Sequence, residues 1–277
     1  MRVSEPILEP AAAAWKAELA LGFQFADGKT VLAEKKFDGP LVVQKPFYPE
    51  GEGVCHAILV HPPAGIAGGD ELFLQVKCKP KASVLMTTPG AGKWYRSAGP
   101  RAGQTLRFDV QGDLEWLPQE TIVFDGALAD MQCEVELGAE GRYIGWEILC
   151  LGRTGSGESF KNGKIYLRTT IRRNGRPLWS ERGRIEGSGR LMSSAAGLGS
   201  RTVCATLLAA APEIDRSVLA SCRAEKGIAA TLLPGLLVAR MLCDSSEAAR
   251  AGLARAWSKL RPQILGRDAV EPRIWRT

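Results

Sequence analysis

Six carboxylate residues stand out because each lies in or beside a turn-like, glycine-containing or aromatic segment: Asp70, Glu120, Asp125, Glu147, Glu158 and Glu181. Two carboxylates at the right separation can hydrolyse a glycosidic bond. One interpretation is therefore a carboxylate-dependent, carbohydrate-active enzyme on a β-rich scaffold. Carboxylates near turns more often cap backbone groups or form salt bridges, so a structural role is the competing interpretation for each of them.

The glycines and histidines argue against two other kinds of catalytic site. Gly92-Lys93 resembles the end of a phosphate-binding loop, but Thr87 and Trp94 stand where that loop requires a glycine and a Ser or Thr. The chain has two histidines, His56 and His61, and no G-x-S-x-G elbow for a nucleophilic serine. On an extended strand these two positions point to opposite faces, so they do not form a shared metal site by themselves.

The cysteines indicate a reducing compartment. There are seven, an odd number, and none forms a C-x-x-C pair. A disulfide scaffold or a structural zinc site would show closer spacing. We therefore expect free, mostly buried thiols and a cytoplasmic protein. No secretory signal is visible in residues 1–25, and the most apolar late segment, residues 227–239, is too short to cross a bilayer.

The charge is unevenly distributed along the chain. Residues 1–140 hold 13 Lys and Arg against 19 Asp and Glu, whereas residues 141–277 hold 23 against 11, which gives the overall +6. A basic half can serve a nucleic acid or an acidic protein partner. No run of five or more Lys and Arg and no recognised nucleic-acid motif is present, so a protein partner is favoured and a nucleic-acid binder is the third interpretation.

Hydrophobic periodicity predicts short strands over the first two-thirds of the chain. Apolar or alternating runs at 54–60, 72–78, 83–88 and 106–110 are separated by proline and glycine. A hairpin is predicted at 165–185, with Asn174-Gly175 as its turn. Its outward positions carry five arginines, which predict either a solvated basic face or a docking surface: Arg168, Arg172, Arg176, Arg182 and Arg184.

The last third is predicted to hold the helices. Pro212 suits a first helical turn, and the apolar positions predict helices at 213–224 and 245–261, the second capped by Asp244 with Glu247. Strands are expected at 228–233 and 236–243, around Pro234-Gly235. No repeat and no low-complexity linker divides the chain, so one continuous, mostly β domain over 1–277 is expected, with a few helices toward the C-terminus.

Several strings in order resemble the UreD family of urease accessory proteins, called UreH in some bacteria. They run from His61 to Asp70, from Thr87 to Ser97, from Leu114 to Gly126, from Gly145 to Glu158 and from Pro272 to Thr277. The resemblance covers about residues 37–277, and the first 20 residues show no family pattern. Ala64, Gly92 and Trp94 depart from the usual family strings by changes of similar size or type.

The resemblance implies a β-helix-like stack of short strands with no catalytic activity and no tightly bound cofactor. It implies a urease maturation factor that supports nickel insertion. The implied partners are urease apoprotein and UreF, with the GTPase UreG reached through UreF. Neither a nucleic acid nor a membrane is expected as a partner. Nickel in transit needs weak oxygen ligands, because a thiolate or imidazole cage would retain it. The hypothetical route residues, chosen for their place in the matching strings, are Asp70, Glu120, Asp125, Glu147 and Glu158, with His61 as a helper.

Overall fold

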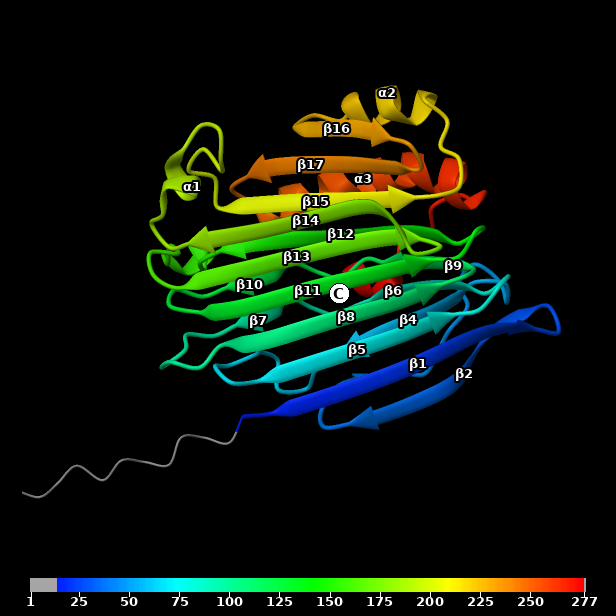
Figure 1. Cartoon of the computed structure of the whole chain (residues 1–277), viewed down its shortest axis with the longest axis horizontal. Coiled ribbons are helices and arrows are strands. Elements are labelled where there is room, and N and C mark those ends of the chain that lie inside the picture. The colour runs from blue at the N-terminus through cyan, green and yellow to red at the C-terminus, as the bar shows by residue number, and fades with distance from the viewer. Residues whose placement is uncertain (1–13, 277) are drawn as a thin grey trace, which may run out of the picture.

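The computed structural model describes residues 14–276. Its main feature is a chain that passes back and forth between two β-sheets, so that consecutive strands mostly lie in opposite layers (Figure 1). Alternating apolar residues explain this arrangement, because every second side chain of a strand points between the layers.

The first sheet has seven strands in the order β14-β13-β11-β8-β5-β1-β2. Its five inner strands, β13, β11, β8, β5 and β1, pair with one another in parallel. β2 and β14 are antiparallel strands at its two edges. The strand bounds are β1 Lys16–Ala26, β2 Lys29–Asp38, β5 Glu71–Cys78, β8 Ala102–Val110, β11 Leu128–Leu137, β13 Lys164–Arg173 and β14 Arg176–Glu186.

The second sheet follows the order β16-β17-β15-β12-β9-β6-β4-β3, and the short strands β7 and β10 pair beside β12. β4, β6, β9 and β12 run parallel, whereas β15, β17 and β16 extend the sheet in antiparallel fashion. The bounds are β3 Val42–Val43, β4 Cys55–Val60, β6 Ser83–Thr87, β7 Gly92–Trp94, β9 Asp113–Trp116, β10 Thr121–Val123, β12 Arg142–Leu151, β15 Val203–Ala210, β16 Ile228–Leu233 and β17 Leu236–Cys243.

The parallel part has the connectivity of a β-helix. One coil runs through β5, β6 and β7, the next through β8, β9 and β10, and a third through β11 and β12. Equivalent strands of successive coils hydrogen-bond in register, such as Leu74 of β5 with Leu106 of β8. The β-helix-like, mainly β fold implied by the family resemblance is thus confirmed.

The predicted hairpin is also confirmed. β13 and β14 pair antiparallel from Lys164 and Glu186 down to a turn at Asn174-Gly175. Both turn residues have positive φ, 48° and 73°, as a tight hairpin turn requires. The strands predicted at 54–60, 72–78, 83–88, 106–110, 228–233 and 236–243 all lie within or close to observed strands.

Two details of the predicted helices are wrong. The helix expected at 213–224 is α2, Ser217–Arg223, because the chain before it makes a turn in which Asp215 accepts the Ser217 amide at 2.7 Å. The long helix is α3, Ser246–Leu265, and its cap is Ser245, whose Oγ accepts the Ala248 amide at 3.1 Å. Asp244 instead pairs with Arg201.

Three short elements complete the chain: α1 Arg190–Ser193 and the 3-10 turns Thr154–Ser156 and Arg273–Arg276. The sequence did not predict nine strands, β1, β2, β3, β7, β9, β10, β11, β12 and β15. No described helix is long and apolar enough to cross a membrane.

Two apolar layers form the core. One lies between the sheets and includes Leu19, Leu74 and Phe108, and the other lies between the second sheet and helices α2 and α3 and includes Trp257 and Leu260. β12 serves both layers, because Ile144 and Ile148 face α3 while Tyr143 and Glu147 face the first sheet. A carboxylate on the inner face of this strand therefore lies inside the molecule.

Candidate internal passage between the two sheets

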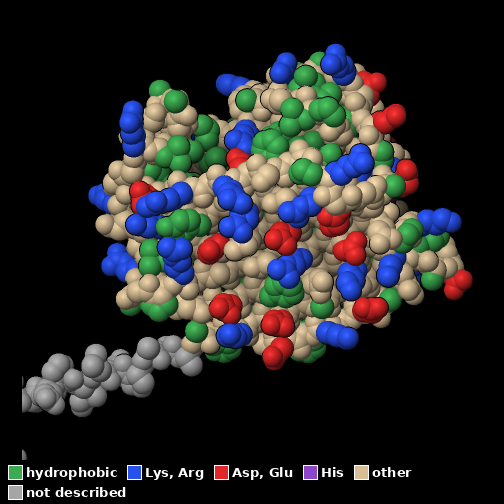
Figure 2. Space-filling model, viewed as in Figure 1, with side chains coloured by type: hydrophobic (Ala, Val, Ile, Leu, Met, Phe, Trp, Pro, Cys, Tyr) green, Lys and Arg blue, Asp and Glu red, His purple; other side chains and the backbone are tan. Residues whose placement is uncertain are grey.

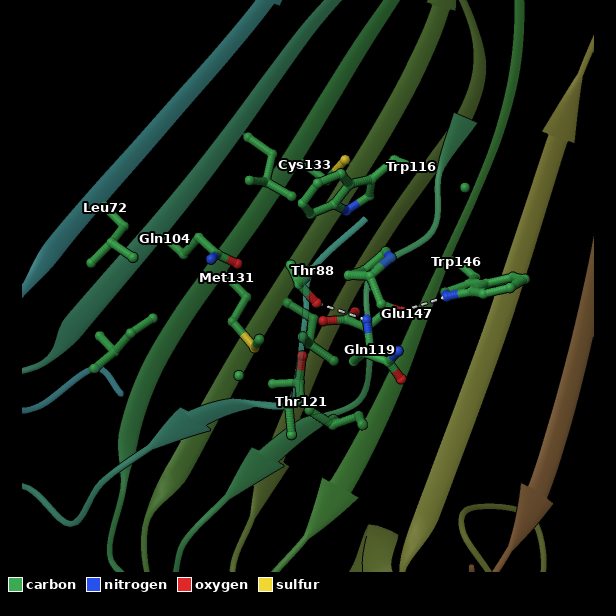
Figure 3. Close-up of a pocket in the computed structure, with 18 of the residues that line it drawn as sticks. Leu72, Thr88, Gln104, Trp116, Gln119, Thr121, Met131, Cys133, Trp146 and Glu147 are labelled. Carbon is green, nitrogen blue, oxygen red and sulfur yellow. Dashed lines mark hydrogen bonds between the residues drawn. The ribbon is translucent and has the colours of Figure 1, made fainter. Parts of the chain in front are cut away.

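The space between the sheets is not completely filled. It contains a cavity of about 700 Å³, most of whose lining is apolar. Polar groups reach it from both layers, and the labelled side chains of Figure 3 show Gln104 and Cys133 from the first sheet opposite Thr88 and Glu147. The cavity is large enough to hold several water molecules and an ion.

The cavity reaches the surface regions at two ends. At one end it is lined by exposed residues of two loops, including Pro62, Ala64 and Gly90. At the other end its lining includes Glu181 on β14 and Arg240 on β17, both partly exposed. Its lining thus extends from one side of the sandwich to another, as a passage requires.

Glu147 is the carboxylate at the middle of this cavity. It lies on β12 opposite Thr206 of β15, and both side chains line the cavity. No hydrogen bond or ion pair links its carboxylate to another described residue. Burial, together with the nearby charge of Glu181, raises the pKa of Glu147 to about 7. An unpaired carboxylate beside open space is available to bind a cation.

The neighbouring residues leave room for that carboxylate. Gly145 precedes it on the same face of β12, and a Cβ at this glycine would lie 2.0 Å from the Tyr143 hydroxyl. The glycine is therefore needed for the Tyr143 ring to fold over the strand. Cys133 faces the same cavity from β11, and burial raises the pKa of its thiol to about 12, so it remains protonated near neutral pH.

His61 lines the loop end of the cavity. Its Nε2 is buried and has no hydrogen-bond partner among the described residues. Burial lowers the pKa of His61, although nearby Asp70 opposes that shift, so the ring is neutral at physiological pH. A neutral imidazole with a free nitrogen can act as a metal ligand. The other histidine, His56, is buried elsewhere and contacts Glu50.

Two of the route residues selected from the sequence bind loops together. Asp125 accepts hydrogen bonds from the Lys161 amide at 2.8 Å and the Asn162 amide at 2.6 Å. Glu158 accepts the Asp125 amide at 3.0 Å and pairs with Arg153 at 2.6 Å. These partners hold the pKa of both carboxyl groups below the usual range. Neither residue lines the cavity.

Asp70 and Glu120 also lie outside the cavity lining. Asp70 is buried and accepts the Trp15 amide at 2.8 Å and the Ala67 amide at 2.7 Å, which fixes the turn before β5. Glu120 is half-buried and lies directly before β10. Among the six route residues predicted from the sequence, Glu147 and His61 are therefore the two that the fold brings to the cavity.

Sequence reasoning missed four chemically active residues of the cavity: Cys133, Glu181, Cys204 and Arg240. Glu181 was noted as a carboxylate but not as part of the route. Strand alternation could have indicated these four residues, because each of them lies on the inner face of a long strand. It could be used only after the register between strands was known.

The predicted basic face lies on the β13–β14 hairpin, where Arg168, Arg172, Arg182 and Arg184 share one side and Arg168 also borders the cavity. The prediction is wrong for Arg176, because a bulge in β14 pairs it with Arg173 and turns it to the other side. All five arginines are exposed, and Figure 2 shows blue side chains gathered over this part of the first sheet. Four of them form no ion pair with any described residue: Arg168, Arg172, Arg176 and Arg182. Arg184 is paired with Glu186. We name the five arginines the basic hairpin.

The electrostatics of the basic hairpin are unfavourable within the isolated chain. Arg168 and Arg182 lie directly opposite each other on the two strands. Like charges in this position destabilise a sheet. The pair is therefore not explained by folding, which favours a role in binding an acidic surface. Within residues 14–276, no group of three or more His, Cys, Asp or Glu side chains is arranged to hold a metal ion.

Comparisons with known proteins agree on one family. The family model described as UreD urease accessory protein matches residues 16–276. A urease accessory protein UreD of Azoarcus sp. strain BH72 is 53% identical, with 98% of this chain and 97% of that protein covered. Those of Dechloromonas aromatica and Pseudomonas aeruginosa are 50% and 47% identical, over 99% and 95% of this chain and 98% and 96% of their own.

Proposed function

The chain belongs to the UreD family of urease accessory proteins, and we propose that within this family role it conducts nickel through the cavity between its sheets toward the urease apoprotein. An accessory protein of this kind is a maturation factor for urease rather than a catalyst. The carbohydrate-active interpretation is therefore set aside. In this proposal nickel is a cargo in transit and not a resident cofactor.

The observation that carries the proposal is the position of Glu147. It is an unpaired carboxylate inside a cavity whose lining extends to two separate surface regions. Because its pKa is about 7, it exists in both protonation states near neutral pH. A cation that approaches favours the ionised form, and a returning proton favours release. One oxygen ligand of this kind binds weakly enough to let a divalent ion move on.

His61 supplies a second contact at the loop end. Its free Nε2 can replace one water of a hydrated nickel ion, and Thr88 adds a hydroxyl oxygen to the lining of the same cavity. The ligands thus come singly along the cavity. Asp70 supports the proposal indirectly, because its hydrogen bond to the Ala67 amide fixes the loop after Ile66, which lines the cavity. Asp125 and Glu158 fix loops that do not line the cavity, and we assign them no nickel contact. We assign no nickel contact to Glu120.

The basic hairpin supports a docking role for the outer surface. Arg168, Arg172 and Arg182 lie on one face and form no ion pair with a described residue, which favours an acidic partner by charge complementarity. We propose that the partners are the urease apoprotein and UreF, with UreG reached through UreF, and that the assembly forms in the cytoplasm. The seven free cysteines are consistent with a reducing compartment.

The proposal is tested by the nickel content of urease. The chain is co-expressed with the urease subunits, UreF and UreG, and the nickel in purified urease is measured by elemental mass spectrometry. Glu147→Gln removes the charge and keeps the size of the side chain, so we expect severalfold less nickel in urease. His61→Asn is expected to give a smaller loss.

Glu120→Gln is the matched control, since it removes a half-buried carboxylate that does not line the cavity. It should leave the nickel content unchanged. Both variant proteins must still co-purify with the other accessory proteins. Normal nickel loading with a soluble, complex-forming Glu147→Gln chain would rule out this route.

A further inference from the structure

β14 lies at an open side of the sandwich. Within residues 14–276 its one ladder is with β13, and no ladder joins it to β15 or β17 of the second sheet. In Figure 1 β14 is drawn next to β15, yet the two belong to different sheets. We call this boundary the seam and define it by Glu181 on β14 and Arg240 on β17.

One ion pair crosses the seam. The Arg240 guanidinium reaches from the second sheet to the Glu181 carboxylate of the first, and it lies 5.9 Å from the centre of the Trp179 ring. Both charged side chains line the cavity and both also meet solvent, with 43% of Arg240 and 36% of Glu181 exposed. The pair therefore stands between the cavity and the outside.

The seam is directly connected to Glu147. Glu147, Thr206 and Arg240 lie opposite one another on β12, β15 and β17, and all three line the cavity. Neighbouring strands are about 4.8 Å apart, so Arg240 begins about 10 Å from Glu147 along this row. Cys204 lies two residues before Thr206 and also lines the cavity.

We propose that the seam is a mouth of the cavity and that the Arg240–Glu181 pair is the latch that closes it. With the pair formed, a guanidinium occupies the opening and its positive charge opposes the passage of a cation. With the pair separated, the opening is cleared and Glu181 faces a passing cation as a free carboxylate. A partly exposed pair contributes little stability, so it can open readily. The claim that the latch controls the passage of nickel rests on the proposed function, whereas the position of the mouth does not.

The cavity thiols give a test that needs no metal. The purified full-length chain is treated with a water-soluble maleimide, and the modification of each cysteine is followed by peptide mass spectrometry. Arg240→Gln and Glu181→Gln both break the latch. We expect each to accelerate the modification of Cys204 by roughly fivefold, as loss of one partly exposed ion pair would allow.

A change in the pKa of Cys204 cannot by itself explain faster modification in both variants. Burial raises the pKa of Cys204, the Arg240 charge lowers it, and the Glu147 and Glu181 charges raise it. Removing the Arg240 charge would by itself slow the thiol, whereas removing the Glu181 charge would by itself accelerate it. Acceleration in both variants therefore reports access. Acceleration in Glu181→Gln with slowing in Arg240→Gln would overturn the latch.

Two further variants complete the test. The exchanged pair, Arg240→Glu with Glu181→Arg, restores attraction across the seam and should return the Cys204 rate toward the original value. Arg201→Gln breaks an exposed pair with Asp244 that does not line the cavity, and it should leave the rate unchanged. An equal acceleration in Arg201→Gln would indicate general loosening and would also overturn the latch.

The two proposals can fail separately. If the latch variants accelerate thiol modification while Glu147→Gln still yields fully loaded urease, the mouth stands and the nickel route is wrong. If Glu147→Gln lowers the nickel content while the latch variants leave Cys204 unchanged, the route stands and its mouth lies elsewhere.

Discussion

Arg261 of α3 and Glu115 of β9 form an ion pair that is completely enclosed by the protein. The Arg261 Nη2 donates to Glu115 Oε2 at 2.8 Å, and the exposed fractions of the two side chains are 0% and 2%. Glu50 pairs with the same guanidinium at 2.6 Å, and the Trp257 indole donates to Glu115 at 2.6 Å. This cluster fastens α3 to the second sheet, whose opposite face borders the cavity.

The first prediction concerns the removal of the buried cation. Arg261→Met keeps much of the side-chain volume but leaves Glu50 and Glu115 without their shared partner. Breaking a buried pair by removing one member costs about 3–5 kcal/mol. We expect a loss of this size in the free energy of unfolding, measured by urea denaturation. Arg255→Met, on the same helix, breaks an exposed pair with Glu225 and should cost less than about 1 kcal/mol. Equal losses in the two variants would contradict a structural role for the cluster.

The second prediction concerns Glu147 and pH. Its folded pKa, about 7, lies above its ordinary value, so the folded state holds the proton more tightly than the unfolded chain. Stability from this group is present at acid pH and is lost as the pH rises toward and through 7. Glu147→Gln removes this loss. Relative to the original protein, the variant should be more stable by about 1 kcal/mol or less near pH 5 and by about 3 kcal/mol near pH 8.

This comparison is made by urea unfolding of both proteins at the two pH values. The difference between the proteins isolates Glu147, because all other titrating groups are shared. A stability difference that does not change with pH would show that Glu147 is ionised throughout, as a solvated carboxylate would be.

The sequence predicted the fold better than the site. Alternating runs such as 72–78, and the Asn174-Gly175 turn, are local features whose meaning does not depend on distant residues. The β-helix connectivity followed from the family resemblance and not from periodicity. β12 was missed because it is buried on both faces and shows no alternation, and buried parallel strands are commonly continuous apolar runs.

The site could not be ranked from the sequence for a related reason. Glu147 and Glu158 both lie in the family strings, yet Glu147 faces a cavity and Glu158 accepts four hydrogen bonds in a loop. Only the register between β12 and β15, and the path of the loop after β12, separates them. The ion pair between Glu181 and Arg240 could not be predicted either, because the two residues are 59 positions apart in the sequence.

The third prediction concerns the start of α3. Asp244 was expected to be the cap, but the Ser245 hydroxyl accepts the Ala248 amide, and Asp244 is engaged with Arg201 and the Thr202 amide. Ser245→Ala should therefore lower the free energy of unfolding by about 1 kcal/mol. Ser258→Ala, at an exposed position within the same helix, should change it by less than about 0.5 kcal/mol. Urea unfolding distinguishes the two, and a neutral Ser245→Ala would show that the cap is dispensable.

The last prediction concerns the basic hairpin and its acidic partner. The double variant Arg168→Glu with Arg182→Glu reverses the charge at its centre but retains like charges opposite each other, so the stability of the sheet should change little. Binding to an acidic surface should weaken by roughly tenfold or more. The measurement is the amount of urease apoprotein and UreF that co-purifies with the tagged chain at low salt.

Lys35→Glu with Lys36→Glu is the control for this variant, since it reverses two exposed charges on β2 at the far edge of the same sheet. It should leave co-purification unchanged. Added salt should reduce binding of the original chain toward that of the hairpin variant, because exposed charges are screened. If the hairpin variant retained both partners as well as the β2 variant at low salt, the arginines would belong to a solvated face. Loss of one partner alone would identify the protein that docks on the hairpin.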